Sequence, residues 1–96
     1  AWEALAERFP AQGMVQFGLG NARHAGGDAR GAIAAFERAL DADPRLAVAW
    51  LNLGLARRGQ DDTAGAREAL ERAAALPGHW QPHARRALED IEEASP

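Results

Sequence analysis

Apolar residues between positions 32 and 40 recur with the spacing of a helix. They fall at Ala32, Ile33, Phe36, Ala39 and Leu40, which is the order i, i+1, i+4, i+7 and i+8. On a helix of about 3.6 residues per turn these side chains form one stripe, and the polar residues between them face away. The pattern predicts an amphipathic helix that buries one side.

The residues around this stripe predict where helices start and stop. The pair Gly26-Gly27 ends a preceding helix over about residues 12–24, and Asp28 supplies a side-chain oxygen that caps the next helix. That helix ends before Asp43, because the residue before Pro44 is pushed out of the helical region.

The same signals return further along the chain. They predict a helix over residues 46–58, a turn at 59–61, a cap at Asp62 or Thr63, and a helix to about residue 76. A shift of 34 positions aligns the two segments, and a fixed period in this range indicates a repeat array. The identical residues are Leu19-Gly20 with Leu53-Gly54, Ala22-Arg23 with Ala56-Arg57, Asp28 with Asp62, Gly31-Ala32 with Gly65-Ala66, Ala35 with Ala69, and Glu37-Arg38-Ala39 with Glu71-Arg72-Ala73.

Small and large residues alternate at the positions where the paired helices should cross. Small residues let antiparallel helices approach closely, and large ones fill the space beside them. The small ones are Gly20, Ala32, Ala39, Gly54, Ala66 and Ala73, and the large ones are Leu19, Phe36, Leu53 and Leu70.

These features resemble the tetratricopeptide repeat family. Each repeat of that family has a first helix with Trp and Leu-Gly and a second helix with Ala, an aromatic residue and Ala, followed by Pro. Two segments follow this pattern: FGLGNARHAGGDARGAIAAFERALDADP and AWLNLGLARRGQDDTAGAREALERAAALP. The resemblance implies an all-α, right-handed superhelix of about six antiparallel helices. It divides a single domain of residues 1–96 into a half-repeat helix at 1–10, repeats at 13–46 and 47–79, and a capping helix at 80–94.

The two ends follow from the phase of the repeat. Pro10 lies 34 positions before Pro44, so Trp2 takes the position of Phe36 in a second helix that lacks its first. After Pro77 a last helix restarts in the first-helix phase, and its polar outer face suits the end of an array. We expect Trp80 to pack as a hydrophobic plug that docks this helix on the one before it, the alternative being an exposed anchor for a partner. The expected inward residues are Ala84, Ala87, Leu88 and Ile91.

Three residues depart from the family pattern. Gln16 stands where the second repeat has Trp50, and Arg23 and Arg57 replace an aromatic or large apolar residue. The apolar stem of an arginine can pack in the core while its guanidinium reaches water or a carboxylate, so we expect the fold to tolerate both arginines.

In the resembling family the first helices line a concave face that holds a peptide. By phase, this implies a groove that holds an extended or helical segment of a partner. Its expected residues are Met14, Phe17, Asn21, Val48, Leu51, Asn52, Leu55, Arg58, Arg85 and Arg86. Alternatively, these apolar residues contact a neighbouring repeat, the parent protein or a second copy.

Asn21, Asn52 and Arg86 also coincide with three of the five positions of the carboxylate clamp in resembling chaperone-adaptor domains. The two lysine positions of that clamp are Phe17 and Pro82 here. We therefore favour a looser groove that grips a peptide by apolar side chains with polar help.

Composition narrows the possible functions. With 11 basic and 14 acidic residues the net charge is -3, which gives no footprint for nucleic acid, and no apolar run is long enough to insert in a membrane. No cysteine is present, the only side-chain hydroxyls are Thr63 and Ser95, and His79 and His83 have no third metal ligand at a suitable spacing. We expect no catalysis, no cofactor and no metal site.

The sequence thus predicts a protein-interaction module. The alternatives are a self-associating scaffold, in which the face around Trp2 and Leu5 meets another copy, and an accessory domain of a larger, enzymatic protein. We expect a soluble protein, cytoplasmic rather than periplasmic. The abundance of Ala and Arg without Lys suggests a GC-rich bacterial genome.

Overall fold

The computed structural model describes residues 2–9 and 12–94, and Pro10, used above to set the phase, lies outside this part. All regular structure in these two ranges is helical, which confirms the predicted all-α class of about six helices. The helices are α1 (Trp2–Arg8), α2 (Gly13–Ala25), α3 (Ala29–Ala42), α4 (Ala47–Gly59), α5 (Thr63–Ala75) and α6 (Gln81–Ala94).

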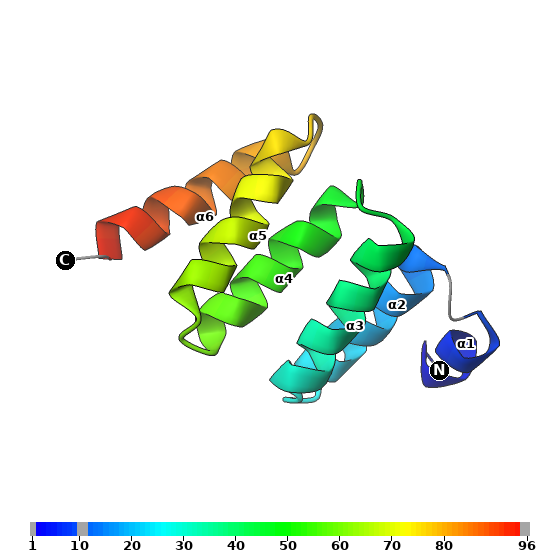
Figure 1. The fold of residues 1–96 in the computed structure, drawn as a ribbon. Coiled ribbons are helices and arrows are strands. Elements are labelled where there is room, and N and C mark those ends of the chain that lie inside the picture. Colours follow the sequence, from blue (N-terminus) through cyan, green and yellow to red (C-terminus); the bar gives the residue numbers. More distant parts are fainter. Residues whose placement is uncertain (1, 10–11, 95–96) are drawn as a thin grey trace.

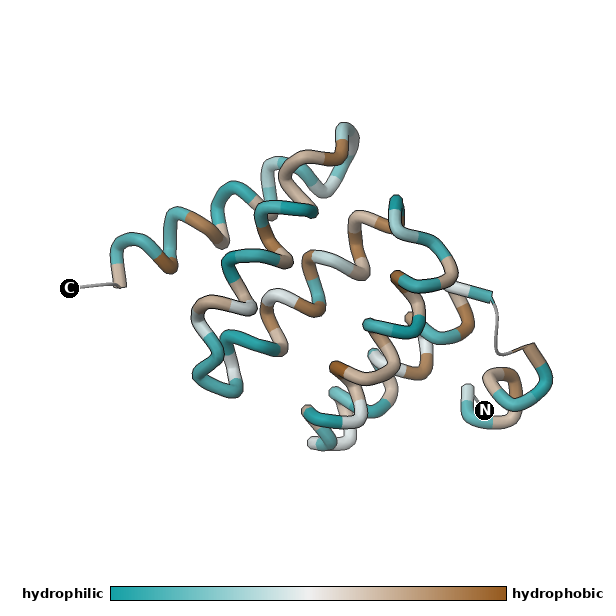
Figure 2. The backbone as a smooth tube through the Cα atoms, viewed as in Figure 1, coloured by the Kyte–Doolittle hydropathy of each residue, from teal (hydrophilic) through white to brown (hydrophobic). Residues whose placement is uncertain are grey.

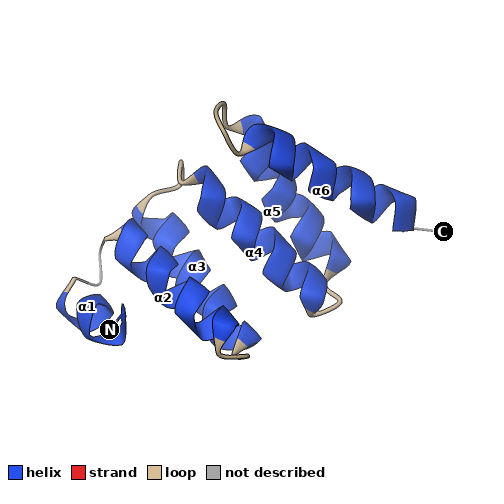
Figure 3. Ribbon diagram, turned by 180° about the vertical axis from the view of Figure 1, so that it is seen from behind, coloured by secondary structure: helices blue, strands red, loops and turns tan. Residues whose placement is uncertain are grey.

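The helices form an elongated stack of 44 × 28 × 17 Å. Figure 1 shows α2 to α6 lying side by side in alternating directions, with the two ends of the chain at opposite ends of the stack. In Figures 1 and 3 α1 is seen nearly end-on while the others are seen from the side, so α1 runs across the stack.

The helix starts follow the predicted caps. The Asp28 carboxylate accepts a hydrogen bond from the Gly31 backbone N–H at 2.9 Å, and Asp62 accepts one from Gly65 at 3.0 Å. Such a contact satisfies a backbone N–H that the first turn of a helix leaves unpaired. Of the two caps proposed for the second repeat, Asp62 is therefore the one formed, and Thr63 is the first residue of α5.

The two turns before these caps share an unusual backbone conformation. Gly27 has a φ of 86° and Asp61, 34 positions later, has a φ of 62°. The left-handed region is open to glycine and costs other residues energy, although aspartate enters it more readily than most. The second repeat thus makes the same turn with a residue that is less suited to it.

The paired helices meet where the small residues were predicted. A Cβ at Gly20 would lie 2.5 Å from Cε1 of Phe36, and one at Gly54 would lie 2.6 Å from Cγ of Leu70. Phe36 and Leu70 are fully buried, so each glycine leaves the space that the opposing large side chain fills. Figure 2 shows apolar and polar residues alternating along the helices, as one buried side requires.

The core continues from helix to helix along the stack. Phe36 of α3 and Leu53 of α4 belong to one buried cluster, and Leu70 of α5 and Ile91 of α6 belong to the next. In α6 the residues Ala84, Ala87 and Ile91 are buried and Leu88 packs against them, as predicted.

The expectation for Trp80 was wrong. It precedes α6 and remains 37% exposed, with its ring edge-on to His79 at 4.9 Å between centroids. Trp80 lies in the turn before α6, whereas Ala84, Ala87 and Ile91 form the buried face of that helix.

The two unusual arginines connect neighbouring repeats. Arg57 donates to the Gly65 carbonyl at 3.2 Å and to the Glu37 carboxylate at 3.3 Å. Arg23 repeats both contacts one period earlier, donating to the Gly31 carbonyl at 3.3 Å and lying 3.9 Å from Glu3. Each arginine therefore ties its own two helices to the second helix of the preceding repeat, and its head reaches a carboxylate as predicted.

Candidate functional site

Two asparagines connect the helices that were predicted to line the groove. Asn52 of α4 donates from Nδ2 to Oδ1 of Asn21 on α2, at 3.0 Å. Asn21 is exposed and Asn52 is half-buried, so the pair lies at the surface between the two helices. We call this surface the α2–α4 face.

A hollow of about 160 Å³ opens beside the asparagine pair. Phe36 forms its floor, since it is only 1% exposed, and Leu55 stands at its rim, 43% exposed. Sites for small molecules and cofactors usually measure about 300–1,000 Å³, so this hollow has room for one side chain of a larger ligand. Its lining is Asn21, His24, Phe36, Asn52, Leu55 and Ala56.

Of the predicted apolar residues, Leu55 lines this hollow, and Met14, Phe17, Val48 and Leu51 do not. Phe17 is half-buried with its ring 5.8 Å from that of Phe36, Val48 is half-buried, and Met14 is exposed. Leu51 is only 6% exposed, because α6 packs on α4 and encloses it with Leu70. A ligand cannot reach this side chain, so Leu51 belongs to the core and leaves the expected groove.

The predicted basic residues do not gather at the hollow. Arg58 and Arg85 are exposed, and Arg86 is paired with Asp90 on its own helix at 3.7 Å. None of the three lines the hollow. The hollow therefore has no preformed arginine clamp for a peptide C-terminus.

Sequence reasoning did not include Phe36 and Ala56 in the site. Phe36 was assigned to the core by the period and Ala56 was noted only as an identity between the repeats, and both are buried. They reach the surface only at the bottom of a gap between α2 and α4, and no sequence signal marks such a gap.

The histidines near α6 do not form a metal site with other residues. The rings of His79 and His83 lie 5.4 Å apart, with Trp80 beside both. Across residues 2–9 and 12–94 no group of three or more His, Asp or Glu side chains is placed to hold a metal ion. In the same ranges no helix is long and apolar enough to cross a membrane.

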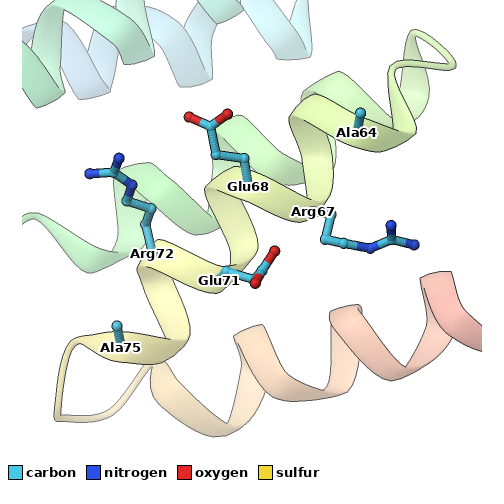
Figure 4. Close-up of a pocket in the computed structure, with 6 residues that line it drawn as sticks. All are labelled: Ala64, Arg67, Glu68, Glu71, Arg72 and Ala75. Carbon is cyan, nitrogen blue, oxygen red and sulfur yellow. The ribbon is translucent and has the colours of Figure 1, made fainter.

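A larger hollow of about 430 Å³ follows the outer side of α5. Figure 4 shows Glu68 and Arg72 projecting to one side of this helix and Arg67 and Glu71 to the other. Its lining comes from α5 alone, and the four charged side chains carry no net charge. This arrangement is typical of a solvated helix face, because it has no converging groups from a second element.

Comparison with known proteins identifies the repeats. A family model described as TPR repeat matches residues 20–61, and a second, described as Tetratricopeptide repeat, matches residues 48–76. The matched residues run from the middle of α2 to the end of α5. A search of curated proteins finds no match.

Proposed function

Because the chain belongs to the tetratricopeptide repeat family, we propose that it is a protein-interaction module that holds a segment of a partner on the α2–α4 face. Repeats of this family are in general protein-interaction modules. The particular surface and the kind of segment rest on the geometry of this chain.

The observation that carries the proposal is the asparagine pair beside an apolar hollow. An asparagine amide can make up to four hydrogen bonds, and the Asn21–Asn52 contact uses one donor of Asn52 and one acceptor position of Asn21. An extended peptide offers a backbone N–H and C=O at each residue. The pair can therefore hold a peptide backbone while one apolar side chain enters the hollow over Phe36.

The surroundings favour an apolar segment over a charged one. Leu55 and Phe36 line the hollow, Phe17 lies beside Phe36, and none of the three predicted arginines is among the lining residues. Recognition then depends on apolar burial and backbone hydrogen bonds, which salt screens weakly. We expect the affinity to change little with ionic strength, unlike that of a clamp for a carboxylate.

The test uses peptides selected from a random displayed library on the immobilised protein. Binding of a synthetic copy is then measured by fluorescence polarisation with Leu55→Glu and a matched control, Leu5→Glu. Leu5 is 41% exposed and Leu55 is 43% exposed, so both changes add a charge at a similar surface leucine. We expect Leu55→Glu to weaken binding by about tenfold or more and Leu5→Glu to leave it within about twofold. Failure to select any peptide, or equal binding by both variants, would count against the proposal.

A second candidate is self-association through α1. Trp2 and Leu5 of this short helix and Phe9 directly after it are all exposed, and such a patch can mark an interface. Light scattering across a concentration series decides the matter. A molar mass that rises with concentration in the wild type, and stays that of a monomer in Leu5→Glu, would support it, whereas a monomer throughout would exclude it.

A further inference from the structure

Three aromatic rings gather where the chain enters α6, at the opposite end of the stack from α1 (Figure 1). His79 and Trp80 lie in the turn before this helix, and His83 lies in its first turn. The ring centres of His79 and His83 are 5.4 Å apart, and that of Trp80 is 4.9 Å from the first and 5.5 Å from the second. All three residues are exposed, so the cluster is open to small solutes.

The backbone brings the two histidines to the same side of the chain. The Ala84 N–H donates to the Trp80 carbonyl at 3.0 Å, so the hydrogen bonding of a helix begins within the turn. Residues four apart on a helix are neighbours on one face. His79 and His83 therefore have the spacing of two ligands to one ion, although His79 precedes the helix.

The distance between the two imidazole rings suits a shared metal ion. Zinc lies about 2.0–2.1 Å from a coordinating imidazole nitrogen, and hence about 3.2 Å from the centre of that ring. Two such rings at the tetrahedral angle have their centres about 5.2 Å apart. The separation of 5.4 Å between His79 and His83 is close to this value.

The tilt between the rings also suits a shared ion. The lone pair of an imidazole nitrogen lies in the plane of its ring, so an ion bound by two imidazoles lies in both planes. The planes of His79 and His83 are inclined by 49° and therefore intersect, whereas parallel stacked rings could not share an ion. Within residues 2–9 and 12–94, no hydrogen bond or ion pair occupies either imidazole.

We propose that His79 and His83 together bind a divalent ion of the zinc class, with water in its remaining coordination positions. Imidazole suits zinc, copper and nickel, whereas magnesium and calcium prefer oxygen ligands. The sequence predicts no metal site because no third ligand has a suitable spacing, but a two-imidazole site needs none. The pair shares no residue with the hollow of the α2–α4 face, so this site is independent of the proposed function.

The test adds zinc chloride to the whole chain at mildly alkaline pH, where free imidazole is neutral and able to bind metal. Proton–carbon correlation spectra follow the ring signals of the three histidines, His24, His79 and His83. We expect the signals of His79 and His83 to shift or broaden together and to saturate at submillimolar free zinc. The His24 signal should stay in place, and magnesium chloride should move none of the three.

Two variants then test whether both imidazoles hold the same ion. His83→Ala removes one ligand, and His24→Ala is the matched control, because it removes an exposed histidine from another surface. Titration calorimetry should show one zinc per chain in the wild type. Zinc binding should weaken about tenfold or more in His83→Ala, because a second ligand on the same chain acts at a high effective concentration, and should stay within about twofold in His24→Ala.

Circular dichroism verifies that His83→Ala is folded, and His79→Ala, outside the helix, replaces it if it is not. Four results would each overturn the proposal. They are a wild type without saturable shifts, His79 and His83 signals that saturate at different zinc concentrations, a folded His83→Ala or His79→Ala that binds zinc as well as His24→Ala, and magnesium shifts equal to those of zinc. Zinc shared between two chains, seen as a doubled molar mass in light scattering, would also overturn it.

Discussion

Replacing Gly20 by alanine tests how tightly α2 and α3 are packed. The new Cβ would lie 2.5 Å from Cε1 and 2.6 Å from Cδ1 of Phe36. Carbon atoms prefer about 3.5–4.0 Å, so the ring would have to retreat by about 1 Å. Phe36 is fully buried in the core cluster, which leaves its ring little room to do so.

Two opposing effects set the size of the change. Alanine favours a helix over glycine by about 1 kcal/mol, whereas overpacking a core costs about 1–3 kcal/mol. Because the displaced group is a rigid buried ring, we take the upper part of that range. Gly20→Ala should therefore lower the free energy of unfolding by about 1–2 kcal/mol.

The same substitution at two other glycines provides the comparison. At Gly18 the Cβ would meet the Trp2 ring, but Trp2 is 43% exposed and its ring can move toward solvent, so we expect little net change. A Cβ at Gly59 would meet no atom within 4 Å beyond its chain neighbours and its own helix backbone, so helix propensity should stabilise the protein by up to about 1 kcal/mol.

Urea unfolding followed by circular dichroism measures all three variants. The order of stability should be Gly59→Ala, then wild type and Gly18→Ala together, then Gly20→Ala, with similar denaturant slopes. A Gly20→Ala protein as stable as Gly59→Ala would refute the close approach of α2 and Phe36. It would also refute the prediction that small residues in one helix face large residues in the next at each helix crossing.

Four further substitutions test the turns, the caps and the contacts between repeats. Asp61→Gly should raise the free energy of unfolding by up to about 1 kcal/mol, because it removes a left-handed non-glycine residue; a lower melting temperature would contradict this. Asp28→Ala should cost about 1 kcal/mol by removing the cap on Gly31, and an unchanged urea midpoint would speak against that cap. Arg57→Ala should cost about 1–3 kcal/mol, since the Gly65 carbonyl loses its side-chain donor and the stem its packing. Glu37→Ala should cost under about 1 kcal/mol, because that carboxylate is half exposed, and equal losses in the two variants would contradict this ranking.

Much of the fold could be predicted because its signals are local or periodic. Asp28 and Asp62 cap their helices through contacts three residues away, so short-range chemistry was enough to find them. Gly20 and Gly54 identified the helix crossings because one packing solution is used twice, at the same phase. A repeat thus turns a tertiary contact into a sequence pattern.

The remaining features depend on how whole helices lie against each other. Leu51 has the phase of an exposed residue, and only the packing of α6 on α4 buries it. Trp80 lies in the turn before α6, off the helix face that packs on the core, and it stays exposed. The hollow over Phe36 lies where the surfaces of α2 and α4 do not meet. Whether such a gap forms depends on helix positions to within fractions of an ångström, which composition and spacing do not encode.

The most direct test of a binding surface between α2 and α4 follows the side-chain amides of Asn21 and Asn52, the only asparagines in the chain. Proton–nitrogen correlation spectra are recorded while a library-selected peptide is added to the labelled protein. Our account predicts that both asparagine signals shift and saturate with the measured dissociation constant, while the amides of Gln60 and Gln81 stay in place. A peptide that binds with the same affinity and leaves both asparagine signals unmoved would place the partner elsewhere and contradict the account.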